Sequence, residues 1–218
     1  MTLLLGDERA AVVRYCGRML GDRLAVGTSG NLSARTGDLV AVTPSGVDYD
    51  ALAPELVGVH RLDGSRVEGR LEPTSEMPMH LTAYRVVPGA GAVVHTHSTS
   101  ATVLSTLVDE LPPIHYLVAM FGGPVRVTPY ATYGTEALAA GMARAMAGRN
   151  AVILGNHGAL TVGGTLGEAY SRAVYLEWLC DVYLRARAVG EPRLLPSDEI
   201  ERVRHKLGTY GQPPTHNG

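Results

Sequence analysis

Short apolar runs, separated by Gly, Pro, Asn and Asp, alternate with amphipathic stretches, and this pattern constrains the fold more than any other feature of the chain. The runs predict strands at residues 31–34, 39–43, 56–62, 92–96, 125–129 and 151–154, and a strand or extended segment at 114–121. Helical periodicity or caps predict helices at 7–20, 76–87, 98–107, 135–147, 166–189 and 197–207. Because the two types interleave irregularly, we expect an α/β protein, a three-layer α/β/α domain with a mainly antiparallel central sheet.

Length and charge narrow the kinds of partner that the chain can have. Its 218 residues fit one domain, 1–218, and its Gly/Pro-rich end predicts a flexible tail from about residue 211. The 19 Lys and Arg against 21 Asp and Glu leave no excess positive charge for a nucleic acid or an anionic membrane. The sequence shows no export signal and no apolar run of about 18 residues, so we expect a cytoplasmic protein.

The strongest local motif is His95-Thr96-His97, which follows the apolar run at 92–94. Two residues apart on a strand, both imidazoles point to the same face, about 6.6 Å apart along the chain. Zinc and similar divalent metals bind imidazole well, and a catalytic zinc commonly has three protein ligands. The spacing alone is equally compatible with two surface histidines, so a metal site requires further ligands.

Two more residues are candidate ligands. His157 lies between Asn156 and Gly158, directly after the predicted strand 151–154, and is the natural third nitrogen, although such a residue is often only a turn histidine. Glu76 lies at the start of a predicted helix, where a carboxylate can also simply cap backbone amides.

Three turns, at residues 28–31, 43–46 and 74–75, combine hydroxyls, small side chains and free backbone N–H groups. Such turns can hold a phosphate without a basic residue, although each is also ordinary turn chemistry. The other histidines have no partner nearby in the sequence and are interpreted as structural or exposed: His60, His80, His115, His205 and His216.

Taken together, the motifs TSGN, TPSG, TSE, HTH, IHY, PYATYGT, NHG and TYG resemble, in order and spacing, the class II aldolase and epimerase family over nearly the whole chain. The resemblance implies a nine-stranded, mostly antiparallel sheet between helical layers and a homotetramer with active sites between subunits. It also implies one zinc ion per chain, bound by His95, His97, His157 and Glu76, with Glu76 then acting as catalytic base. By the same motifs, the substrate phosphate is bound by Asn31, Ser45, Gly46, Thr74 and Ser75, and Tyr116 and Tyr210 act at a neighbouring subunit's site.

Within this family the chain is most similar to the aldolases that cleave a ketose 1-phosphate such as L-fuculose 1-phosphate into dihydroxyacetone phosphate and a short aldehyde such as L-lactaldehyde. A pentulose-phosphate 4-epimerase generally has Asp where this chain has Glu76. A methylthioribulose-phosphate dehydratase shares the metal-binding scaffold, and an adducin-like interaction module lacks the metal site. Tyr133 replaces the usual Phe, Ser29 replaces Ala and Thr74 replaces Ser, and the first of these leaves the aldehyde specificity open.

Overall fold

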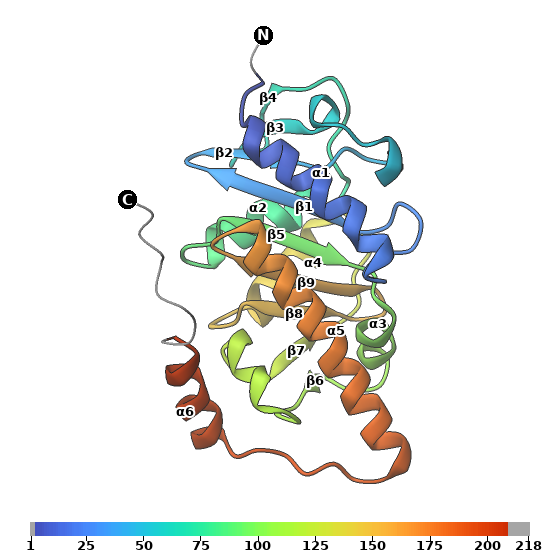
Figure 1. Ribbon diagram of the computed structural model, residues 1–218, viewed down its shortest axis with the longest axis vertical. Helices are drawn as coiled ribbons and strands as arrows, with labels where there is room; N and C mark the ends of the chain where they lie inside the picture. The colour runs from blue at the N-terminus through green and yellow to red at the C-terminus, as the bar shows by residue number, and fades with distance from the viewer. Residues whose placement is uncertain (1–2, 209–218) are drawn as a thin grey trace, which may run out of the picture.

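A nine-stranded sheet forms the centre of the computed structural model, which describes residues 3–208 (Figure 1). The strand order is β4-β3-β2-β1-β5-β9-β8-β7-β6, and every pairing is antiparallel except β7 with β8. The α/β class and the mainly antiparallel sheet are therefore confirmed. The strands are β1 Asn31–Thr36, β2 Leu39–Val42, β3 Gly58–Arg61, β4 Arg66–Glu68, β5 Ala92–Thr96, β6 Glu110–Leu111, β7 Val125–Thr128, β8 Ala151–Leu154 and β9 Gly158–Gly163.

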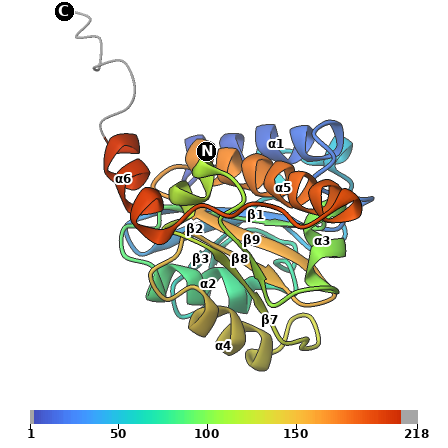
Figure 2. The ribbon, with the colours of Figure 1, turned by 90° about the horizontal axis from the view of Figure 1, so that it is seen from below.

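Helices cover both faces of this sheet (Figure 2). α1 and α5 lie on one face, α2 and α4 lie on the other, and α3 packs against α5 near one end of the strands. The last helix, α6, packs against η3. The helices are α1 Gly6–Gly21, α2 Met77–Val86, α3 Thr99–Ser105, α4 Glu136–Ala145, α5 Leu166–Val189 and α6 Ser197–Leu207, with short 3-10 helices η1 Tyr49–Ala51, η2 Pro54–Leu56 and η3 Tyr116–Phe121.

The central strand β5 shows how the sheet divides the core. Ala92 and Val94 pack in the cluster formed with α1 and α5, whereas Val93 packs in the cluster formed with α2 and α4. Successive side chains of a strand point to opposite faces, so His95 must point to the same face as Val93. The face covered by α2 is thus the one on which the predicted metal ligands lie.

Two parts of the strand prediction differ from the structure. Residues 116–121 form the 3-10 helix η3 instead of a strand. The backbone is still extended at His115, and the His115 side chain then accepts a hydrogen bond from Leu117 N at 3.2 Å, which caps the start of η3. β4, β6 and β9 were not predicted; the first two are very short, and β9 begins and ends with glycine. Both cysteines, Cys16 and Cys180, are buried and free.

In residues 3–208, no helix combines the length and the apolar character that a membrane span requires.

Candidate metal centre

Four side chains from three separate segments meet on the α2 face of the sheet. Glu76 immediately precedes α2, His95 lies on β5, His97 follows that strand, and His157 lies in the connection between β8 and β9. One potential ligand atom from each residue lies within 4.8 Å of the others. Glu76 and His95 are buried, and the other two are partly buried. The structure therefore brings together all four metal ligands predicted from the sequence.

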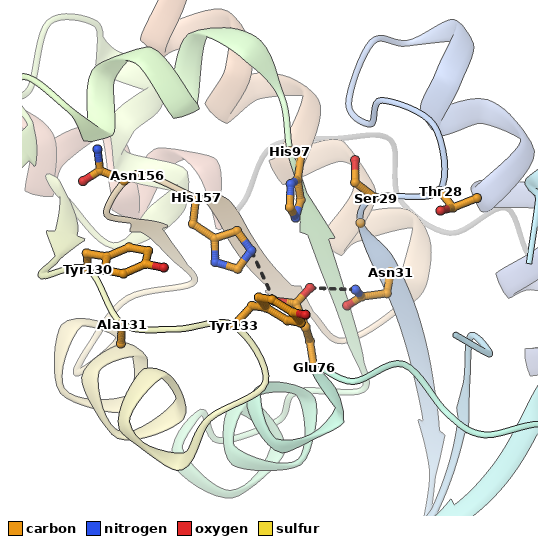
Figure 3. Close-up of a pocket in the computed structure, with 11 residues that line it drawn as sticks. Thr28, Ser29, Asn31, Glu76, His97, Tyr130, Ala131, Tyr133, Asn156 and His157 are labelled. Carbon is orange, nitrogen blue, oxygen red and sulfur yellow. Dashed lines mark hydrogen bonds and ion pairs between the residues drawn. The ribbon is translucent and has the colours of Figure 1, made fainter. Parts of the chain in front are cut away.

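The distances within this cluster are short. His95 Nε2 lies 2.9 Å from His97 Nε2 and 2.9 Å from Glu76 Oε2, while His157 Nε2 lies 3.2 Å from Glu76 Oε1. The three imidazole rings contact one another edge to face, with centroids 4.7 to 4.9 Å apart. Three ring edges and one carboxylate thus converge on a single point, and Figure 3 shows His97, His157 and Glu76 around it.

The hydrogen bonds around the cluster decide which nitrogen of His95 is free. Its Nδ1 lies 2.9 Å from the carbonyl oxygen of Ala159, which can only accept, so Nδ1 carries the proton in the neutral ring. The lone pair of Nε2 is then directed at the cluster. A backbone carbonyl that fixes the tautomer in this way is the usual outer partner of a metal-binding histidine.

The charge states also suit a metal site. Burial alone would raise the pKa of Glu76, but the facing imidazoles of His95 and His157 and the amide of Asn31 together lower it, so the carboxylate is ionised at neutral pH. Burial, and after it the neighbouring imidazoles, lowers the pKa of His97 to about 3, so that ring is neutral. An ionised carboxylate and a neutral imidazole are the forms that bind metals.

The backbone around His157 depends on a glycine. Asn156 has φ 53°, in the left-handed region, and turns the chain tightly from β8 into β9. A Cβ on the next glycine, Gly158, would lie 2.1 Å from the carbonyl oxygen of Thr96. Only glycine therefore lets β9 approach β5 at this point, and this approach brings His157 to His95 and His97.

A cavity of about 270 Å³ opens beside the cluster. Its walls come from the turn before β1, from the connection between β7 and α4, and from the β8–β9 turn (Figure 3). Tyr130 and Tyr133, which lie in the connection between β7 and α4, are 63% and 65% exposed, so this side of the cavity is open to solvent. The lining residues are Thr28, Ser29, Gly30, Asn31, Glu76, His97, Tyr130, Ala131, Tyr133, Asn156 and His157.

Apart from Asn31, the residues predicted to bind phosphate lie in two turns that contact each other. Ser45 N donates to Glu72 O at 3.0 Å, and Thr74 N donates to Thr43 O at 2.9 Å. Ser45, Gly46 and Ser75 are exposed, whereas Thr74 is buried and accepts a hydrogen bond from Glu76 N. Thr74 and Ser75 present hydroxyls next to Glu76 in the sequence, but neither turn lines the cavity described in the preceding paragraph.

The Asn31 side chain, which is predicted to bind phosphate, already forms hydrogen bonds within the protein. Its Nδ2 donates to Glu76 Oε2 at 3.0 Å, and its Oδ1 lies 2.6 Å from His80 Nε2. Since an amide nitrogen carries two hydrogens, one N–H remains for a ligand in the cavity. His80, interpreted from the sequence as structural or exposed, is fully buried and is the residue that sequence reasoning missed here. The sequence feature that could have pointed to His80 is its position four residues after Glu76, a spacing that places both side chains on the same side of the helix.

Tyr116, the first of the two predicted tyrosines, does not line this cavity. Tyr116 begins η3, is 48% exposed, and packs its ring against His115 with centroids 4.4 Å apart. It lines a separate hollow with residues of α5 and α6. Tyr210 lies outside the described residues. Within residues 3–208, no tyrosine hydroxyl predicted to act as an acid is therefore brought to the metal cluster by its own chain.

The residues present fit a divalent metal ion. Glu76 Oε1 is buried and has no hydrogen bond of good geometry among the described residues, although His157 Nε2 is 3.2 Å away. Two nitrogens 2.9 Å apart can share only one proton, whereas a zinc ion bound at about 2.0 to 2.1 Å would separate its tetrahedral ligands by about 3.3 Å. To form such a site, the side chains would widen the 2.9 Å contacts by a few tenths of an ångström and close the wider ones, which are at most 4.8 Å. Three imidazoles and one carboxylate are also the donors that zinc prefers.

Comparisons with known proteins agree with this arrangement. The family model described as Class II Aldolase and Adducin N-terminal domain matches residues 10–184. The chain is 41% identical over 212 residues to 5-deoxy-D-ribulose 1-phosphate aldolase of Bacillus thuringiensis serovar kurstaki, covering 96% of this chain and 100% of that protein. It is 36% identical to L-fuculose phosphate aldolase of Escherichia coli strain K12, covering 92% and 94%. A solved structure of L-fuculose 1-phosphate aldolase superimposes with a TM-score of 0.92 at 38% identity, covering 94% of this chain and 98% of that one.

The cluster predicts the metal content of the purified protein. We expect about one divalent metal ion per chain and, since a metal that binds only the folded state stabilises it, a lower thermal midpoint after chelation. His97→Ala should lose most of the metal, whereas His205→Ala, a change at an exposed histidine on α6, should keep it. Elemental analysis and thermal denaturation measure both effects. Never-chelated protein without any divalent metal would contradict the assignment.

Proposed function

The chain belongs to the class II aldolase and adducin N-terminal domain family, and from this premise we propose that it is a zinc-dependent aldolase that cleaves a 5-deoxyketose 1-phosphate into dihydroxyacetone phosphate and a short aldehyde. The observation that carries the proposal is the cluster of Glu76, His95, His97 and His157, of which the first two are buried and the other two partly buried. A module that only binds other proteins would have no use for an ionised carboxylate held among three imidazoles. The cluster and the family membership together support metal-dependent aldolase chemistry on a ketose 1-phosphate.

Two substrates are compatible with the relatives. Cleavage between C3 and C4 turns 5-deoxyribulose 1-phosphate into dihydroxyacetone phosphate and acetaldehyde, whereas L-fuculose 1-phosphate gives L-lactaldehyde. The sequence motifs favoured the second. The 41% identity over 96% of the chain to a 5-deoxy-D-ribulose 1-phosphate aldolase supports the first, which we propose as the main substrate. L-fuculose 1-phosphate is retained as the second candidate because of the 38% identity and full-length superposition with that aldolase.

The reaction requires two proton transfers. A proton leaves the C4 hydroxyl, the C3–C4 bond breaks with its electron pair left on the C3 fragment, and a proton then reaches C3. A divalent metal held by the cluster supplies Lewis-acid polarisation of the substrate oxygens when it is bound. We propose that Glu76, ionised and at the wall of the cavity, handles the proton at C3.

The substrate phosphate is proposed to lie over the two adjoining turns. Ser45, Gly46 and Ser75 are exposed there, and Thr74 and Asn31 lie beside them and Glu76. None of these residues carries a charge, so recognition would depend on hydroxyl and backbone N–H donors. Backbone pairing between the turns, such as the hydrogen bond from Thr74 N to Thr43 O, holds them in place. The hydroxyl and N–H donors of the turns therefore lose little freedom when a ligand binds.

A substrate comparison tests this function. We expect kcat/KM to be highest for 5-deoxyribulose 1-phosphate, lower for L-fuculose 1-phosphate, and lower by at least about 10²-fold for unphosphorylated 5-deoxyribulose, because a site built of hydrogen-bond donors discriminates against a substrate without the acceptors. Dihydroxyacetone phosphate and the released aldehyde are measured separately. A preference for L-fuculose 1-phosphate would select the second candidate. Absence of C–C cleavage with every ketose phosphate would reject the proposed function, and equal activity on the unphosphorylated ketose would reject the phosphate site.

We further propose a homotetramer in which Tyr116 and Tyr210 act at a neighbouring subunit's site. The support is that Tyr116 is 48% exposed and lies apart from the cavity of its own chain. The exposed apolar side chains of α5, among them Tyr175 and Trp178, provide a surface nearby for subunit contact. A tyrosine from a second copy could then donate a proton to the aldehyde oxygen in the condensation direction.

Replacement of this phenol tests the arrangement. Tyr116→Phe should lower C–C cleavage by roughly 10²- to 10⁴-fold, the range for a lost general acid, and affect hydrogen exchange at the dihydroxyacetone phosphate carbon much less. Tyr175→Phe, at a partly exposed tyrosine lining the same hollow, is the matched control and should remain active. Equal loss of cleavage and exchange in Tyr116→Phe, or no loss of either, would show that Tyr116 has only a packing role. A monomer in solution would reject the shared site.

A further inference from the structure

A line of buried polar side chains connects the metal cluster to the interior between β1 and α2. From the cluster inward it contains Glu76, Asn31, His80, Ser33 and Tyr84, which we call the β1–α2 hydrogen-bond chain. Each of these residues is at most 5% exposed. Its contacts are Glu76 Oε2 with Asn31 Nδ2 at 3.0 Å, Asn31 Oδ1 with His80 Nε2 at 2.6 Å, His80 Nδ1 with Ser33 Oγ at 2.7 Å, and Ser33 Oγ with Tyr84 Oη at 2.7 Å.

The spacing of strand and helix explains why these residues meet. Glu76, His80 and Tyr84 recur every four residues, and four residues of α-helix advance about 6.0 Å. Asn31 and Ser33 are two residues apart on one face of β1, and two residues of strand advance about 6.6 Å. Because the two repeats nearly match, side chains from the helix segment and from the strand alternate along the β1–α2 hydrogen-bond chain.

The hydrogen bonds of the chain have only one consistent direction. An ionised carboxylate can only accept, so the Asn31 nitrogen must face Glu76 and the Asn31 oxygen must face His80. His80 Nε2 therefore carries a proton. Burial, and after it the electrostatic effect of the His95 imidazole, lowers the pKa of His80 to about 3, so the ring is neutral and its Nδ1 accepts from the Ser33 hydroxyl. The Ser33 oxygen in turn accepts from Tyr84.

We propose that His80 is a positioning residue, held by Ser33 and Tyr84 in the tautomer protonated at Nε2, which fixes the Asn31 amide so that it always donates to Glu76 Oε2. In the reversed orientation, the Asn31 oxygen would face the carboxylate and its NH₂ group would face the His80 N–H. Two hydrogen bonds would then be replaced by two repulsive contacts. Glu76 is thereby held in one orientation, with Oε1 left toward His157.

This role rests on the proposed function of Glu76 as the group that moves the C3 proton. It goes beyond that function because His80 is not one of the predicted metal ligands, does not line the cavity, and forms its hydrogen bonds with Asn31 and Ser33. A group that must accept and return a proton works best when its geometry is fixed before the substrate binds. His80 acts on that geometry only through Asn31. The dependence on Asn31 is what distinguishes positioning from ordinary packing in the core.

A double-mutant cycle tests the dependence. With zinc supplied at saturation and its content measured, His80→Leu should lower kcat for cleavage and the rate of hydrogen exchange in dihydroxyacetone phosphate by about 10- to 100-fold, the usual effect of losing an outer partner, with a much smaller change in KM. His80→Gln should restore most of both rates, because the Gln amide can still donate to Asn31. The double variant His80→Leu/Asn31→Ala should lose no more than Asn31→Ala alone. Thr82→Val, which removes a hydroxyl on α2 that accepts from Arg85 and is not part of the β1–α2 hydrogen-bond chain, is the control and should remain active.

Losses that add in the double variant, failure of Gln to restore the rates, or an equal loss in Thr82→Val would overturn the positioning role. Neutron diffraction of the zinc-loaded wild type gives a test that requires neither activity nor a stable variant. Deuterium should be present on His80 Nε2 and absent from Nδ1, with the Asn31 nitrogen facing Glu76. Deuterium on Nδ1 or a reversed amide would overturn the proposal, even if the protein proves to be an aldolase. Absence of aldolase activity together with the expected deuterium positions would instead reject the proposed function of Glu76.

Discussion

The structure of the site depends on one buried carboxylate. Glu76 is 5% exposed, and an ionised carboxylate at that depth is strongly destabilised unless charges or hydrogen-bond donors surround it. His95 lies 2.9 Å from one oxygen, Asn31 donates to the same oxygen at 3.0 Å, and His157 lies 3.2 Å from the other. Each of these partners comes from a different strand or turn. The position of Glu76 therefore requires that β1, β5 and the β8–β9 turn meet at the start of α2.

The sheet satisfies this requirement through its strand order. β5 lies between β1 and β9, and its register places His95 opposite Asn31 on one side and opposite Leu160 on the other. Residues paired in an antiparallel ladder point to the same face, so Asn31 and His95 both point toward α2. Gly158 allows β9 to approach closely enough to complete the set, since a Cβ there would meet Thr96 O at 2.1 Å. A site made from such distant segments can form only when the whole central sheet has formed.

The sequence predicts much of this architecture where the signal is local. β5 and β8 were predicted with their observed bounds, because each is a continuous apolar run bounded by turn or polar residues. α5 and α6 were predicted because helical periodicity and a following glycine mark their extent. The four metal ligands came from motif spacing together with the family resemblance. His80 could not be recognised, because its partners Asn31 and Ser33 lie 49 and 47 residues away in the chain. η3 was missed because its start depends on a contact between the His115 side chain and a backbone amide, which apolar periodicity does not encode.

Glu76 has two roles in this account, as a metal ligand and as the group that moves the C3 proton, and only the second requires an ionisable oxygen. Zinc-loaded Glu76→Gln protein separates them, because the amide keeps the shape of the side chain and cannot accept the proton. The direct measurement is the rate at which this variant exchanges the carbon-bound hydrogen of dihydroxyacetone phosphate with solvent, compared with wild type at equal zinc content. The account predicts a fall of at least about 10²-fold, the lower range for a positioned acid–base group. Exchange near the wild-type rate would show that another group moves the proton and would contradict the central claim.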